Sequence, residues 1–207
     1  MKMCSKISLL LLLLLSKVAM ATGLYSDVEW TTASSGILVR ISSPITCVAQ
    51  SYIAAHTLPI TTIVLKAETI NSPVGHVWVE FRADSAGSPN SVALSTSTIV
   101  NVGSLTNTYK EVSFSLTTPI TVTLGTTYWI VVFGDYVIDG SKCLEFAAHS
   151  GAGGYSGGVA KQYDGASWSN CGDGSWDLYF KVQAGHAIVS NSTLRDLTAI
   201  RMLTTKH

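Results

Sequence analysis

The feature that most limits the fold of this chain is a repeated alternation of apolar and polar residues. Residues 76–83 read His-Val-Trp-Val-Glu-Phe-Arg-Ala, so Val77, Val79 and Phe81 share one side of an extended chain. The same period of two recurs over residues 111–116. Because successive side chains of a strand point to opposite faces, this alternation predicts strands with one buried face and one exposed face.

Residues typical of turns separate these alternating stretches. Two examples are Asn71-Ser-Pro-Val-Gly75 and Asp84-Ser-Ala-Gly-Ser-Pro-Asn90, which combine proline, glycine and short polar side chains. Many short strands joined by turns, without a helical pattern before residue 190, predict an all-β fold. We expect a jelly-roll β-sandwich of two antiparallel sheets. The predicted strands are residues 37–41, 46–53, 59–69, 75–83, 91–101, 108–116, 119–124, 126–134, 142–148, 158–163 and 175–183.

The N-terminal segment has the pattern of a secretory leader. Lys2 and Lys6 precede an apolar run over residues 7–15, and the small-x-small sequence Ala-Met-Ala follows at residues 19–21. The run is too short for a helix that spans a hydrocarbon core about 30 Å thick. We therefore expect residues 1–21 to be a signal peptide, which leaves a secreted protein without a membrane span. A retained anchor is the alternative.

The remaining chain divides into a central domain and two terminal segments. The alternation covers residues 37–185, which form the predicted jelly-roll domain. Residues 22–36 are polar and form either an extended arm or an extra edge strand. In residues 186–207, leucine and isoleucine recur every three residues from Leu194 to Leu203, which predicts a short helical or flexible C-terminal tail. Both terminal segments are candidates for self-association between copies of the chain.

The charge balance argues against one class of partner. The full chain has 13 Lys and Arg residues and 13 Asp and Glu residues. Removal of the leader takes away Lys2, Lys6 and Lys17, which leaves ten basic residues against thirteen acidic ones. No basic stripe remains, so nucleic acid is not an expected partner.

Three cysteines remain after the leader: Cys47, Cys143 and Cys171. Exported proteins commonly form disulfides. We expect a Cys143–Cys171 bond because both residues flank the same loop-rich segment, and such a bond would contribute on the order of 3 kcal/mol. Pairings that involve Cys47 stay open.

Aromatic and polar side chains are the candidates for ligand binding. A sugar ring presents a face of C–H groups that stacks on an aromatic ring, while carboxylates and amides bind its hydroxyls. One group of candidates lies on the polar side of the stretch 76–83, where it forms either an open platform or a second buried face. A second group lies among the glycines of residues 153–168, where it either contacts a ligand or closes the end of the sandwich. The candidates are Trp78, Glu80, Arg82, Tyr155, Tyr163 and Trp168.

Signals for catalysis and for metal binding are weak. The sequence has no His-Glu-x-x-His motif and no phosphate-binding loop, and Ser156 interrupts the dinucleotide pattern that begins at Gly151. Acidic residues at turns, such as Asp84, lack the spacing of a calcium loop. The histidines are scattered, without a close pair of ligands. We expect a protein that is not an enzyme and needs no cofactor or metal.

The order of several segments resembles a known kind of domain. The segments include Ala49-Gln-Ser-Tyr52, Val77-Trp-Val-Glu-Phe-Arg-Ala-Asp84, Thr126-Thr-Tyr-Trp-Ile-Val131 and Asp177-Leu-Tyr-Phe-Lys-Val182. In this order they resemble the jelly-roll modules of the choice-of-anchor type in secreted bacterial and phage-associated proteins, which are similar in architecture to carbohydrate-binding modules. The resemblance covers roughly residues 46–184. It implies a non-catalytic β-sandwich used for surface display, adhesion or glycan contact.

These observations predict a secreted protein that acts by surface binding, through weak adhesion to a glycan or another cell-surface polymer. The alternative is a structural or assembly subunit of a virion, a fibre or an extracellular matrix, which would use its terminal segments. A hydrolase is a third hypothesis, and it requires two clustered carboxyl groups in a cleft.

Overall fold

The computed structural model describes residues 21–32, 38–41, 44–136, 141–151 and 154–188. Contacts divide the chain into a body, Tyr25–Ala184, and a second unit made of Met1–Leu24 and Gly185–His207. Strands make up most of the described residues, and the one helical element among them is the short 3₁₀ helix η1, Val102–Ser104. No helix in these ranges is long and apolar enough to cross a membrane.

The first sheet, here called sheet A, has seven strands. Its main order is β1-β14-β4-β10-β13, with β8 paired to β4 and β2 paired to β10. The long strand β4 is its centre, because it pairs with β8 on one side and with β14 and β10 on the other. The strands are β1 (Ala21–Trp30), β2 (Leu38–Ile41), β4 (Leu58–Ile70), β8 (Lys110–Val122), β10 (Cys143–His149), β13 (Asp177–Leu178) and β14 (Phe180–Ile188).

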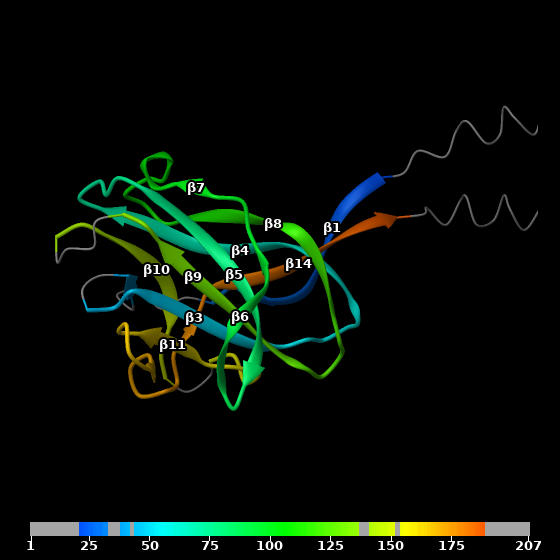
Figure 1. Cartoon of the computed structure of the whole chain (residues 1–207). Coiled ribbons are helices and arrows are strands. Elements are labelled where there is room, and N and C mark those ends of the chain that lie inside the picture. The colour runs from blue at the N-terminus through cyan, green and yellow to red at the C-terminus, as the bar shows by residue number, and fades with distance from the viewer. Residues whose placement is uncertain (1–20, 33–37, 42–43, 137–140, 152–153, 189–207) are drawn as a thin grey trace, which may run out of the picture. The chain divides into compact units, whose positions relative to one another are not determined.

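The second sheet, here called sheet B, also has seven strands. Its order is β12-β11-β3-β9-β5-β6, with β7 paired to β5. Figure 1 shows its middle strands β3, β9 and β5 side by side. The strands are β3 (Cys47–Ile53), β5 (His76–Ser85), β6 (Ser88–Thr96), β7 (Val100–Asn101), β9 (Thr127–Gly134), β11 (Ala160–Tyr163) and β12 (Trp168–Asn170).

The main core lies between the two sheets and follows the alternation of the sequence. Val77, Val79 and Phe81 of β5 are at most 1% exposed, and Phe114 of β8 contributes to the same cluster. Burial of apolar surface stabilises such a core by about 25 cal/mol per Å². The structure therefore confirms the predicted all-β sandwich of two antiparallel sheets. The predicted C-terminal tail falls on residues 189–207, which lie outside the described residues apart from the end of β14.

The expected disulfide between Cys143 and Cys171 is not formed. Both residues, and Cys47, are buried and not bonded to another cysteine. Cys143 begins β10, whereas Cys171 follows β12 in sheet B, in a region that meets the opposite end of β10 through β13. Shared flanking of a loop-rich segment did not bring the two thiols together.

Candidate functional site

The candidate site is the outward face of sheet B. In an antiparallel pair, residues directly opposite each other point to the same face. Strand register places Trp168 opposite Tyr163, Tyr163 opposite Cys47, Cys47 opposite Phe133 and Phe133 opposite Trp78. These five residues form one line across β12, β11, β3, β9 and β5, which we call the aromatic row. Four spacings between neighbouring strands make the row about 19 Å long.

The aromatic row consists of two ring pairs with a cysteine between them. Trp78 and Phe133 are stacked, with ring centroids 5.9 Å apart and planes 15° apart. Tyr163 and Trp168 are tilted by 41°, with centroids 5.1 Å apart. All four aromatic side chains are half-buried, whereas Cys47 is 1% exposed. Each pair therefore leaves part of its ring surface to solvent.

A small second core lies on the same face as the row. Cys47, Ala49, Trp129 and Val131 are buried there, and three aromatic members of the row, Phe133, Tyr163 and Trp168, pack against them. Lys161 covers part of this cluster, with its Nζ atom 5.6 Å from the ring centre of Trp129. The long aliphatic chain of a lysine can cover apolar surface while its ammonium group keeps hydrogen bonds to polar groups. Burial raises the pKa of the Cys47 thiol to about 11, so this thiol stays protonated.

Gly158 allows strand β11 to approach strand β3 closely at the edge of this face. A Cβ atom on Gly158 would lie 1.9 Å from the carbonyl oxygen of Ser51, which no other residue could tolerate. The close approach lets Ser51 and Val159 exchange hydrogen bonds, including Ser51 N to Val159 O at 3.1 Å. The glycine-rich stretch thus docks β11 on β3 and sets Tyr163 beside Cys47.

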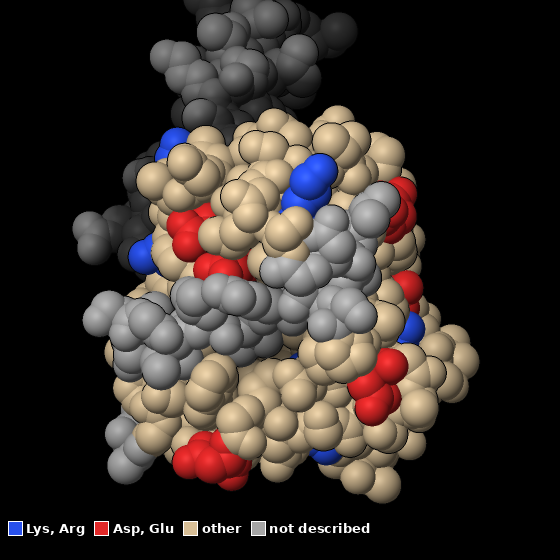
Figure 2. Space-filling model, turned by 90° about the vertical axis from the view of Figure 1, so that its left-hand side faces the viewer, with Lys and Arg blue, Asp and Glu red and all other residues tan. Residues whose placement is uncertain are grey.

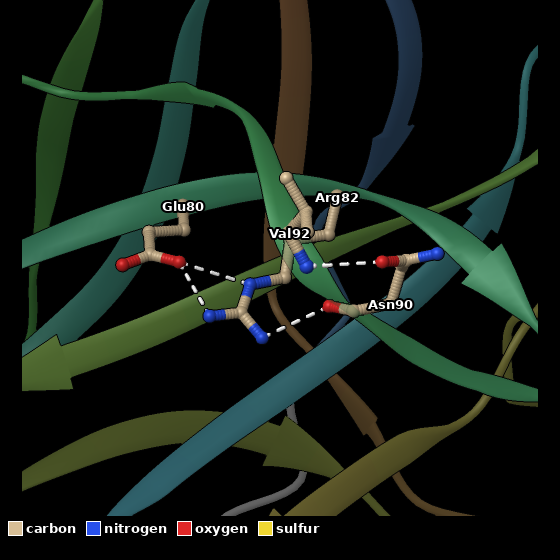
Figure 3. Close-up of polar contacts among 4 residues, drawn as sticks. All are labelled: Glu80, Arg82, Asn90 and Val92. Carbon is tan, nitrogen blue, oxygen red and sulfur yellow. Dashed lines mark hydrogen bonds and ion pairs between the residues drawn. The ribbon is translucent and has the colours of Figure 1, made fainter.

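Glu80, Arg82, Asn90 and Val92 form a hydrogen-bonded polar group on strands β5 and β6 (Figure 3). Arg82 donates from Nε and Nη2 to the same oxygen of Glu80, Oε2, at 2.9 and 2.5 Å. Its Nη1 atom donates to the carbonyl oxygen of Asn90 at 3.0 Å. The Asn90 side-chain oxygen accepts from Val92 N at 2.9 Å. The guanidinium also lies 5.1 Å from the ring centre of Phe133, so charged and aromatic groups form one surface.

The structure brings five of the six predicted binding residues to this face: Trp78, Glu80, Arg82, Tyr163 and Trp168. It does not bring Tyr155 there. The Tyr155 ring packs against Phe180 at 5.3 Å, and its hydroxyl accepts from Ile53 N at 3.2 Å. Burial raises the pKa of this phenol. Tyr155 therefore packs against the core between the sheets. This agrees with the alternative in which residues of this loop close the end of the sandwich.

Sequence reasoning missed three contributors to the face: Phe133, Lys161 and Asn90. Residues 128–133 are apolar on both sides, so they indicate burial on both faces without indicating which rings reach the surface. Cross-strand register supplies that information, and the sequence does not contain it directly. The inclusion of Phe133 is what joins Trp78 to the cysteine and to β11.

A second polar cluster lies between the sheets, but its groups satisfy one another. Gln50 donates to Asp177 Oδ1 at 2.8 Å and accepts from Leu178 N at 2.7 Å. The other Asp177 oxygen accepts from Tyr155 N at 2.9 Å. Burial raises the pKa of Asp177, and Gln50 opposes that effect. These bonds tie β3 of sheet B to β13 of sheet A, which indicates a structural role.

One sequence pattern invites comparison with hydrolases. Gly154-Tyr-Ser-Gly-Gly158 fits Gly-x-Ser-x-Gly, in which the serine stands on a sharp turn between a strand and a helix. Here Ser156 is exposed in a turn that leads to strand β11, and no α-helix occurs in the ranges described above. The strand–turn–helix setting of a nucleophilic serine is therefore missing.

Two acidic side chains in sheet A form a pair. Glu68 of β4 lies opposite Glu145 of β10. Burial, followed by the Glu145 charge, raises the pKa of Glu68. A glycosidase needs two carboxyl groups that flank a bound sugar in a cleft. Glu145 is only 1% exposed, so this pair does not stand in an open cleft.

The described part of the chain contains no cluster of metal ligands. No group of three His, Cys, Asp or Glu side chains there could hold a metal ion. Figure 2 shows one end of the molecule, where acidic and basic side chains are scattered singly among uncharged residues. This surface offers no broad patch of one sign.

Comparison with known proteins finds no protein-family model and no curated protein that matches this chain. The resemblance to choice-of-anchor and carbohydrate-binding modules therefore stays a prediction from the order of its segments.

Proposed function

We propose that this protein is a secreted, non-catalytic binding protein that holds a glycan on the outward face of sheet B. The observation that carries the proposal is the aromatic row with its adjoining Glu80–Arg82 pair. Half-buried rings offer C–H stacking surface, and a fixed carboxylate beside them offers an acceptor for hydroxyl groups. A length of about 19 Å suits several sugar units rather than a single one.

Several features favour binding over turnover. The Glu80 carboxylate accepts two hydrogen bonds from Arg82, which favour its charged form and make it a poor proton donor. The Glu68–Glu145 pair belongs to the other sheet. The rigidity of the face supports binding as well, because little side-chain freedom is lost when a ligand settles on it.

Affinity electrophoresis in gels that contain polysaccharide tests this proposal. We expect Trp78→Ala and Trp168→Ala to weaken retention about tenfold each, since one aromatic stacking contact contributes about 1.5 kcal/mol. Tyr25→Ala is the matched control, because Tyr25 is an aromatic residue that is 48% exposed on β1 of sheet A. Retention that survives both tryptophan changes, in variants that remain folded, would remove sheet B as the binding face.

A further inference from the structure

We infer that the glycan is an uncharged polysaccharide, an inference that rests on the proposed function. The strands of sheet B carry two Lys or Arg residues, Arg82 and Lys161. A sheet that recognised uronates or sulfated sugars would present such cations with unused donors toward the ligand. Both cations instead donate hydrogen bonds to other groups of the protein.

Arg82 is neutralised within the face. It forms an ion pair with Glu80 at 2.5 Å, and the two side chains are only 13% and 20% exposed. Partial burial strengthens this pair relative to one in open solvent. An anionic sugar that approached the guanidinium would also approach the Glu80 carboxylate, so attraction and repulsion would largely cancel.

Lys161 is held at the β5–β6 turn. Its Nζ atom donates to Gly87 O at 2.5 Å and to Ser88 Oγ at 3.1 Å. The same turn contains Asp84, whose two carboxylate oxygens accept from Trp129 Nε1 at 2.7 Å and from Gly87 N at 3.1 Å. Positive and negative charge are therefore balanced at this end of the face as well.

A second pair of titratable side chains on β5 and the loop after β9 is His76 with Asp135. His76 lies two residues before Trp78 on β5, and its Nδ1 atom is 3.0 Å from Asp135 Oδ2. The hydrogen bond from His76 lowers the pKa of Asp135. Along β5, Arg82 is paired with Glu80, and the other acidic groups are Asp84 and the neighbouring Asp135, so the strand presents no excess of positive charge.

The polar atoms left for a ligand suit hydroxyl groups. Both Arg82 bonds use Glu80 Oε2, so Oε1 can accept from a sugar hydroxyl. Glu80 and Trp78 share one face of β5, so this carboxylate and the Trp78–Phe133 pair belong to the same surface. A neutral sugar can stack on the rings and donate to this carboxylate at once, whereas a carboxylate ligand would meet a like charge there.

Matched polysaccharide pairs test the inference on the full chain. Hydroxyethyl cellulose is compared with carboxymethyl cellulose, galactan with polygalacturonate, and mannan with polymannuronate. Each comparison is made at about 0.1 M and about 1 M NaCl, where the Debye length falls from about 10 Å to about 3 Å. We expect retention by at least one neutral member, with a change below about twofold between the two salt concentrations.

Two other results have different meanings. Stronger retention by acidic members that is lost at high salt overturns the uncharged class while it leaves glycan binding in place. Retention by no member of any pair overturns the proposed function, and the inference falls with it.

Glu80→Gln provides an independent readout in the same gels. This change leaves the Arg82 charge without its carboxylate partner, so we expect retention by an acidic polysaccharide to rise about tenfold at low salt. Glu111→Gln is the matched control, because Glu111 pairs with Lys181 at 2.8 Å on sheet A. An equal rise in both variants would show that net charge alone is responsible and would contradict the assignment to sheet B.

Discussion

Trp78 and Trp129 lie on the same outward face of sheet B, but their surroundings differ. Trp129 is 1% exposed, lies under Lys161 and donates from Nε1 to Asp84 at 2.7 Å. Trp78 is half-buried and contacts Phe133 on one side. The first side chain belongs to a core and the second to a surface. The sequence already separates them, because Trp129 lies in the continuous apolar run of residues 128–133 and Trp78 lies on the polar side of an alternating stretch.

Substitution of these two tryptophans should therefore have unequal effects on stability. We expect Trp129→Ala to lower the free energy of unfolding by about 3 to 5 kcal/mol, because it removes a buried ring and its hydrogen bond. Trp78→Ala should cost about 1 kcal/mol. Urea denaturation followed by circular dichroism measures both values. Equal losses would mean that Trp78 is a core residue as well.

Among the elements, β8 shows where sequence patterns stop being informative. Residues 108–116 and 119–124 predict two strands separated by a turn, but the structure has one strand, Lys110–Val122. The pairing with β4 shifts between Ser115 and Ile120, and Thr117 and Thr118 contact β6 of sheet B instead. Pro119 has no N–H to donate, which suits this bulge. Threonine and proline are common both in turns and in bulges, so the sequence could not distinguish a turn from a bulge at residues 117–119.

The pairing of β4 with β10 should make stability depend on pH. Burial and the Glu145 charge raise the pKa of Glu68 above its usual 4.5, so the folded protein holds this proton more tightly than the unfolded chain does. The resulting stabilisation is complete below pH 4.5 and is lost as pH rises through the raised pKa. The difference in unfolding free energy between the wild type and Glu68→Gln, measured by urea titration across this range, should fall with increasing pH. A difference that is independent of pH would contradict the raised pKa of Glu68.

The cysteines give a test of the strand arrangement in both sheets. Cys47, Cys143 and Cys171 are all buried, and burial raises the pKa of Cys171 to about 12. A buried, protonated thiol is inert toward disulfide reagents. We expect the three thiols to react with Ellman's reagent after denaturation and not before. Reaction of a single thiol after denaturation would reveal a disulfide.

At the scale of the whole molecule, the sequence was sufficient to predict the sandwich and to name five residues that lie on the proposed binding face. The alternation predicted which side chains of β5 and β8 face the core, because a strand with one buried face has apolar residues at every second position. It also grouped Trp78, Glu80 and Arg82 on one side of β5. It could not show that Tyr163 and Trp168 share this surface, or that Tyr155 leaves it, because those positions depend on which strands become neighbours.

Sheet B, through its aromatic row, is the surface that we propose binds a glycan. The five tryptophans of the chain provide five indole signals in a nitrogen-edited NMR spectrum. During titration with an oligosaccharide of the best-retained polysaccharide, we predict shifts for Trp78 and Trp168. Trp30 and Trp176, which pack against the core between the sheets, should be unaffected. Shifts at Trp30 and Trp176, with Trp78 and Trp168 unchanged, would contradict the claim.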